Sequence, residues 1–114
     1  MSRKDDLAYV KDILTACERI RLILSEDSSP EVMRRISVQD SLVHNIQIVG
    51  EAANQLSDSF KARVSMIDWQ AMIGMRHRIV HNYFDIDLDI VWDTVLHDLP
   101  QLEAALKPWL PEIE

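Results

Sequence analysis

Hydrophobic residues recur at intervals of three and four along most of the chain, the spacing that places them on one face of an α-helix. The pattern predicts four long helices, over residues 5–25, 38–56, 69–83 and 88–110. Two shorter helical segments are expected, at residues 30–36 and 58–64. Only two glycines and four prolines occur, too few turn formers for a sheet of many short strands. The sequence therefore predicts an all-α fold, a four-helix bundle with one or two short additional helices.

Four residues are expected to shape these helices. Ser37 and Asp68 stand just before the second and third helices, where a side-chain oxygen can cap the first turn. Gly50 lies inside the second helix, where glycine costs about 1 kcal/mol relative to alanine, so we expect another backbone to approach it closely. Pro100 lies within the fourth helix and removes one of its hydrogen bonds, so we expect a kink there.

The length and composition indicate a single folded domain over residues 1–114. Domains commonly have about 100–150 residues, and a hydrophobic fraction of 47% is typical of globular proteins. Cys17 is the only cysteine, which excludes an intrachain disulfide and predicts a small buried side chain. The N-terminal residues do not form the apolar run of a signal peptide, and no stretch has the roughly 20 apolar residues of a membrane helix. We therefore expect a soluble cytoplasmic protein that contacts no membrane.

Charge is distributed unevenly along the chain. The net charge is −7, which weighs against binding nucleic acid over a long groove of phosphate contacts. Residues 85–114 contain eight acids and one lysine, whereas residues 69–84 contain two arginines and no acid. A small basic segment in an acidic protein favours a local contact with one or a few phosphates.

Residues 76–83, with the sequence RHRIVHNY, concentrate the groups that could act on a phosphate. An arginine fork binds phosphate through two hydrogen bonds, and a histidine can take the proton of a ribose 2′-hydroxyl so that the oxygen attacks phosphorus. That chemistry needs no metal. On one ideal helix Arg76 and Tyr83 would share a face, whereas His81 would lie about 140° away from Arg76. Three explanations remain open: the arginine reaches around, the last turn unwinds, or two chains share the site.

Each of these residues also has a purely structural interpretation. Arg78 is expected to lie along the surface or pair with an acid of the fourth helix. His77 and His81 would be an i, i+4 pair able to hold a metal, but no third ligand stands nearby, so we assign no metal. Glu51 is interpreted as a solvated residue, or alternatively as a partner that supports an arginine. His44 and His97 stand alone and are given no role.

The segment resembles the Arg-x4-His-x-Tyr signature of the HEPN superfamily, and the chain is similar to HepT, the toxin of HepT/MntA toxin–antitoxin pairs. The resemblance extends to the segments IVGEA at residues 48–52 and IDW at residues 67–69, and to the exit Tyr83-Phe84. One position differs. The residue after the arginine is often Asn or Asp in the superfamily, and here it is His77, which could act as a polar partner or a second acid or base, or could alter the activity.

The resemblance implies a homodimeric, metal-independent endoribonuclease without a cofactor, with Arg76 and His81 at a cleft between protomers. His77 and Asn82 would support the site. It also implies a partner nucleotidyltransferase that neutralises the toxin by transferring AMP to Tyr83, in a hetero-oligomer of unknown composition. Two other functions stay open from the sequence: a non-catalytic HEPN module that binds a nucleotide or docks a nucleotidyltransferase, and a plain helical dimerisation domain.

Overall fold

The structure is a computed structural model that describes residues 3–27, 29–82 and 84–113, with the side chains of residues 5–27, 29–82 and 84–111. Its elements follow one another as α1 (Arg3–Ser25), η1 (Pro30–Arg34), α2 (Ile36–Gln55), α3 (Asp58–Arg63), α4 (Trp69–Ile79), β1 (Val80–Asn82), β2 (Asp85–Ile86), α5 (Leu88–Asp93), η2 (Thr94–Asp98), α6 (Leu99–Leu106), η3 (Lys107–Trp109) and α7 (Leu110–Ile113). The predicted all-α fold is confirmed, with one two-stranded hairpin added to it.

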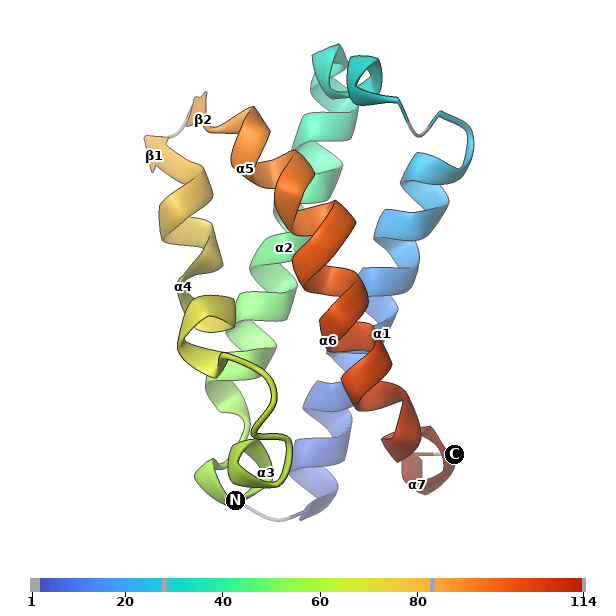
Figure 1. The fold of residues 1–114 in the computed structure, drawn as a ribbon, viewed down its shortest axis with the longest axis vertical. Helices are drawn as coiled ribbons and strands as arrows, with labels where there is room; N and C mark the ends of the chain where they lie inside the picture. Colours follow the sequence, from blue (N-terminus) through green and yellow to red (C-terminus); the bar gives the residue numbers. More distant parts are fainter. Residues whose placement is uncertain (1–2, 28, 83, 114) are drawn as a thin grey trace.

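The long helices form an up-and-down bundle that is 41 × 28 × 20 Å in extent (Figure 1). Helix α2 packs against α1 and α4, and the segment from α5 to α6 returns along the bundle and packs against α1. The helical periodicity of the sequence is the cause, since each long helix contributes its hydrophobic face to one continuous core. The most completely buried large side chains of this core are Ile13, Leu42, Ile46, Met75, Ile79, Leu102 and Leu106.

Gly50 lies where α2 and α4 cross, as the sequence predicted. A Cβ built on Gly50 would stand 3.4 Å from the carbonyl oxygen of Met72 and 3.5 Å from that of Ile73. The absence of a side chain therefore lets the backbone of α4 approach α2 directly. Gly74 differs, because a Cβ there would meet nothing within 4 Å.

The segment around Pro100 stays helical, as expected, but adapts in a way the sequence did not indicate. Thr94, Asp98 and Leu99 keep right-handed helical backbone angles where one element passes into the next. Pro100 lies in the first turn of α6, and the five residues before that helix form the π-helical turn η2. A π turn is a known way to accommodate a missing backbone donor within a helix.

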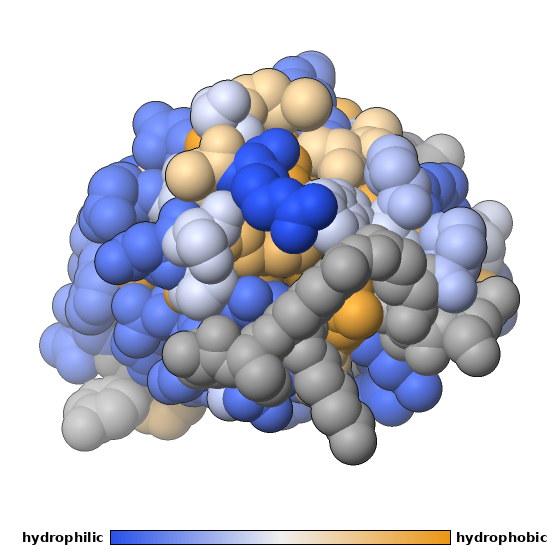
Figure 2. Space-filling view, turned by 90° about the horizontal axis from the view of Figure 1, so that it is seen from below, coloured by the Kyte–Doolittle hydropathy of each residue, from blue (hydrophilic) through white to orange (hydrophobic). Residues whose placement is uncertain are grey.

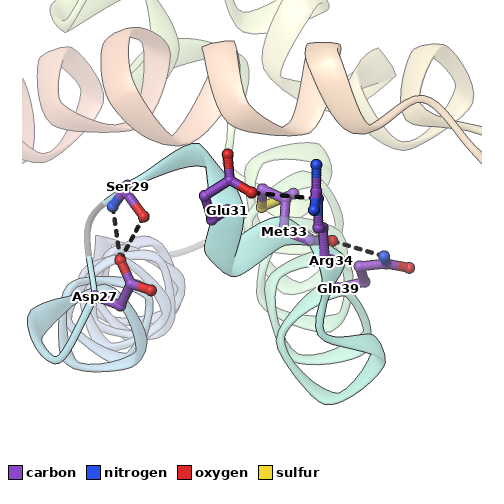
Figure 3. Close-up of polar contacts among 6 residues, drawn as sticks. All are labelled: Asp27, Ser29, Glu31, Met33, Arg34 and Gln39. Carbon is purple, nitrogen blue, oxygen red and sulfur yellow. Dashed lines mark hydrogen bonds and ion pairs between the residues drawn. The ribbon is translucent and has the colours of Figure 1, made fainter.

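Polar contacts organise the connection between α1 and α2 (Figure 3). The side chain and the backbone N–H of Ser29 both donate to Asp27 Oδ1, at 2.7 and 2.9 Å, and hold the pKa of Asp27 below its ordinary value. Gln39 Nε2 donates to the carbonyl oxygen of Met33 at 2.7 Å. The predicted cap at Ser37 is wrong, because α2 begins two residues earlier, at Ile36: the N–H groups of Val38 and Gln39 both donate to the Arg35 carbonyl.

Helix α4 begins as predicted and ends earlier than predicted. The Asp68 carboxylate accepts a hydrogen bond from the Ala71 N–H at 3.0 Å and so caps the first turn. The helix was expected to continue to residue 83, but it ends at Ile79. The carbonyl of Ile79 accepts from the Asp87 N–H at 2.8 Å, and β1 pairs with β2 in antiparallel fashion. Backbone pairing across this hairpin thus replaces the last helical turn.

The opposite end of the bundle is closed by aromatic packing. The ring of Phe60 lies 4.8 Å from that of Trp109, and the Arg63 guanidinium stands 4.6 Å from the centre of the Trp109 ring. Seen from this end, hydrophobic residues reach the surface between hydrophilic ones (Figure 2). Among the helices of the described chain, none combines the length and the hydrophobicity that crossing a bilayer requires.

Candidate functional site

The side chains predicted to carry chemistry lie at the C-terminal end of α4 and on the hairpin after it, near one end of the bundle (Figure 1). Arg76, His77 and Arg78 are exposed on the last turn of α4, and His81 and Asn82 are exposed on β1. Tyr83, the predicted modification site, lies outside the described residues. The helical surface positions are what the sequence predicted, whereas the placement of His81 on a strand is not.

Arg76 points toward α2 and is joined to it. Its Nε donates a hydrogen bond of 3.2 Å to Gln47 Oε1, and Gln47 Nε2 donates one of 3.1 Å to Glu51 Oε1. Glu51 is therefore connected to the arginine through an amide, the alternative that the sequence analysis had ranked second. Gln47 itself was missed. Its signal in the sequence is the i, i+4 spacing to Glu51 on either side of Gly50, the residue that marks the helix crossing.

A shallow hollow of about 220 Å³ lies between α2 and α4 beside these contacts. It brings Arg76 and His77 together with the polar face of α2. Its lining consists of Gln47, Gly50, Glu51, Asn54, Ile73, Arg76 and His77. His81 and Asn82 are not among the residues that line this hollow. One chain therefore brings Arg76 and His77 together in one hollow and holds His81 on a neighbouring element.

Arg78 lies on the other flank of α4. Its Nη2 donates a hydrogen bond of 3.2 Å to the carbonyl oxygen of Ala71. It lines a separate hollow of about 260 Å³ together with Asp98 and Gln101 of the fourth helical segment. This placement agrees with the structural interpretation of Arg78 and separates its charge from the hollow that holds Arg76.

His81 occupies an irregular position in the hairpin. Val80 stands opposite Ile86 and Asn82 opposite Asp85, so one extra residue on β1, His81, falls between the two pairs. Such a bulge bends the strand and re-aims the side chain it carries, and bulges are frequent beside active sites. The helical angle predicted for His81 relative to Arg76 does not apply, because α4 has ended at Ile79; Tyr83 lies outside the described residues. The i, i+4 geometry of His77 and His81 is lost for the same reason.

Other reactive groups of the described chain do not form a competing site. No cluster of three or more His, Cys, Asp or Glu side chains suited to a metal is found among the described residues. Burial, and next the charge of Glu103, raise the pKa of the Cys17 thiol to about 12, so this group stays protonated. His97 bonds to Asp93 at 2.9 Å within its own helical segment.

One large apolar side chain accompanies the hairpin. Phe84, which follows the predicted modification site, exposes 97% of its surface.

Of the acids near the hairpin, the Asp87 carboxylate is occupied as the cap of α5, where it accepts a hydrogen bond from the Ile90 N–H at 3.1 Å. The exposed basic and titratable groups of α4 and β1 thus face solvent without a described carboxylate in direct contact.

Comparison with known proteins identifies relatives over nearly the whole chain. A family model described as "Ribonuclease HepT-like" matches residues 13–108. "Putative RNase TTE0752" of Caldanaerobacter subterraneus is 32% identical over 105 residues, covering 87% of this chain and 88% of that protein. "Probable ribonuclease HepT" of Thermococcus cleftensis is 31% identical over 106 residues, covering 93% and 94%. "Putative RNase MJ0127" of Methanocaldococcus jannaschii is 25% identical over 114 residues, covering 100% and 94%. No solved structure matches the chain.

Proposed function

We propose, from the premise that this chain belongs to the HepT-like ribonuclease family of the HEPN superfamily, that it is a toxin that cleaves RNA without a metal ion. The proposal rests on the hydrogen bonding and exposure of the Arg76 side chain. Its Nε is held by Gln47, while its side chain is exposed at the edge of a hollow. Arg76 belongs to residues 69–84, the longest stretch of the sequence without an acid. The two terminal nitrogens make no hydrogen bond with any residue that the structure describes, and a phosphate can bind them as a fork.

The reaction proposed is an internal transfer at phosphorus. His81 takes the proton of a ribose 2′-hydroxyl, the 2′-oxygen forms a bond to the adjacent phosphorus, and the bond from phosphorus to the 5′-oxygen breaks. The 5′-oxygen then receives a proton. The products are a 2′,3′-cyclic phosphate and a 5′-hydroxyl end. Arg76 neutralises charge on the phosphate oxygens, and His77 and Asn82 support the site as polar neighbours.

A second copy of the chain would complete this site. One histidine cannot easily serve both sides of the phosphorus, and a two-fold dimer with α4 near its axis supplies a second His81 to protonate the leaving oxygen. Gly74 supports this arrangement. It costs helix stability, yet a side chain there would meet nothing of its own chain within 4 Å, which leaves room for a second backbone.

The dimer is tested by an arginine at this glycine. Gly74→Arg is expected to shift the protein from dimer to monomer in sedimentation analysis without loss of helical content. Ala8→Arg, a small exposed residue of α1 changed in the same way, is the control and should remain dimeric. A dimer that survives Gly74→Arg would exclude α4 from the axis.

Regulation is proposed to act on Tyr83. A partner nucleotidyltransferase would transfer AMP to its phenol, and the added phosphate would block RNA. Tyr83 stands two residues after His81, which is the spacing of the Arg-x4-His-x-Tyr signature, and this supports the proposal. The test is a mass spectrum of the protein co-expressed with a nucleotidyltransferase encoded beside it: the added mass of AMP on the peptide that contains Tyr83 is expected, and a peptide that stays unmodified opposes the proposal.

The decisive experiment for catalysis is RNA cleavage by purified protein in EDTA. The wild type is expected to yield fragments with cyclic phosphate ends, and His81→Ala should not. Cleavage by His81→Ala at the wild-type rate would refute the role of His81. Tight binding of AMP or ATP with no RNA cleavage by the wild type would favour a non-catalytic module instead, an outcome for which the hollow beside Arg76 and His77 would be the binding site.

A further inference from the structure

The chain Arg76–Gln47–Glu51 couples the proposed phosphate-binding residue to a carboxylate on another helix. The two hydrogen bonds, of 3.2 and 3.1 Å, run in one direction from guanidinium to amide to carboxylate. Both α2 residues lie on the face of that helix that lines the hollow. The link spans the point where Gly50 allows α2 and α4 to approach closely, so its length is fixed by the packing of the two helices.

The chemistry of the end groups decides the orientation of the central amide. A guanidinium only donates and a carboxylate only accepts, so Gln47 must present its oxygen to Arg76 and its nitrogen to Glu51. Without Glu51, the amide can rotate and turn its NH₂ group toward the arginine, where two donors repel. Glu51 thus controls the atom that the arginine meets.

The neutral amide also keeps the carboxylate one side chain away from the guanidinium. A carboxylate in direct contact with Arg76 would compete with the phosphate for the same positive charge. Through Gln47 the carboxylate instead polarises the amide oxygen toward the arginine, as happens in chains of hydrogen bonds. The arginine is aimed by its Nε and keeps its charge and its two terminal nitrogens for the ligand.

We propose that Gln47 and Glu51 are positioning residues that aim the Arg76 guanidinium at the phosphate of the substrate. This inference rests on the proposed ribonuclease function for its ligand, and on the observed hydrogen bonds for its geometry. Neither residue touches the reacting atoms. Both act through Arg76.

The kinetic test is a double-mutant cycle on RNA cleavage. Gln47→Ala and Glu51→Ala are each expected to lower kcat/KM by about 10-fold, the effect of losing one hydrogen bond to a charged group. In an Arg76→Ala background, the same changes should have no further effect. Gln47→Glu is expected to be at least as harmful as Gln47→Ala, because it neutralises the arginine directly. His44→Ala, an exposed residue of α2 three positions before Gln47, is the control and should keep wild-type kinetics.

A readout that needs no activity accompanies the kinetics. In nitrogen-15 NMR spectra, the Arg76 Nε–H should exchange with solvent more slowly in the wild type than in Gln47→Ala or Glu51→Ala. Thermal unfolding midpoints should be unchanged, since both hydrogen bonds are exposed.

The outcomes separate the two proposals. Wild-type cleavage rates in Gln47→Ala and Glu51→Ala, or losses that add fully to that of Arg76→Ala, would overturn the positioning role and leave the ribonuclease function standing. An inactive wild type would overturn the ribonuclease function. The aiming of Arg76 is then decided by the Nε–H exchange alone: slower exchange in the wild type supports it, and equal exchange in all variants overturns it.

Discussion

The crossing of α2 with α4 and the hairpin after α4 hold the two parts of the candidate site in different ways. At the crossing, Gly50 brings two long helices into backbone contact, and Arg76 is tied across it by Gln47. The hairpin consists of strands of three and two residues with a bulge at His81; Val80 and Ile86 are half-buried against the core, whereas His81 and Asn82 are exposed. Arg76, the proposed phosphate-binding residue, is thus held in place within one chain, whereas His81, the proposed acid–base residue, stands on a two-stranded element of five residues.

The largest expected effect comes from His81→Ala, which removes the reactive group of the hairpin. It should lower kcat for RNA cleavage by about 10²–10⁴-fold, the usual contribution of general acid–base catalysis, and leave KM nearly unchanged. His97→Ala, an exposed histidine paired with Asp93, is the control and should be neutral. A rise in KM without a fall in kcat would assign His81 to substrate binding. The proposal that the helix crossing binds phosphate and the hairpin supplies the acid–base group would then be wrong.

A smaller loss is expected from Arg76→Lys at the crossing. Lysine keeps the charge but has no planar fork, so it cannot hold Gln47 and grip a phosphate through two nitrogens at once. We expect kcat/KM to fall by about 10–100-fold in steady-state cleavage assays. Arg78→Lys is the same change on the opposite flank of α4 and should matter little. Equal losses in both variants would mean that the site is not confined to the side facing α2.

The contact between the helices is tested by stability. Gly50→Leu should lower the free energy of unfolding by about 1–3 kcal/mol, because its side chain must displace the backbone of α4. Gly50→Ala is the matched control. Its Cβ would make ordinary contacts at 3.4 and 3.5 Å, so urea unfolding should show no loss and, from the helix propensity of alanine, a gain of up to about 1 kcal/mol. If Gly50→Leu were as stable as the wild type, α2 and α4 would not be in contact there.

The smallest effect, of opposite sign, belongs to Gly74→Ala. Alanine is favoured over glycine inside a helix by about 1 kcal/mol, and its Cβ would meet nothing of its own chain. Urea unfolding of dilute, monomeric protein should therefore show a gain of up to about that size. A loss of stability in the monomer would reveal an intrachain constraint on α4 that the structure does not contain.

The parts of this fold that the sequence predicted are those decided by local rules. Hydrophobic spacing located the long helices, Asp68 marked the start of α4, and the cost of Gly50 marked the crossing. The parts that it missed depend on backbone hydrogen bonds and chain paths that hydrophobic spacing does not show. The end of α4 depends on the amide of Asp87, and the start of α2 on how the chain leaves η1.

The same distinction between predicted and missed features applies to the candidate site. The helical positions of Arg76 and Arg78 were predicted because neighbouring residues of a helix project in different directions. The role of Gln47 in holding Arg76 was not, because it arises only when two helices pack. The geometry of His81 was left open among three explanations, because a periodic pattern cannot show where pairing across a hairpin replaces a helical turn; the structure has the last predicted turn unwound. The assignment of catalytic roles to these residues stays a prediction.

The contact at Gly50 also acts as a pivot. Gln47 lies only three residues from it, about 4.5 Å along α2, so a change of about 10° in the angle between the helices moves that side chain by less than about 1 Å. Ile79, six residues beyond Ile73 on α4, stands about 9 Å from the pivot and moves about twice as far. Rocking of α4 therefore swings the hairpin while the arginine stays nearly in place. In the proposed function, a second copy of the chain or an RNA bound to the hairpin would thereby move His81 relative to Arg76.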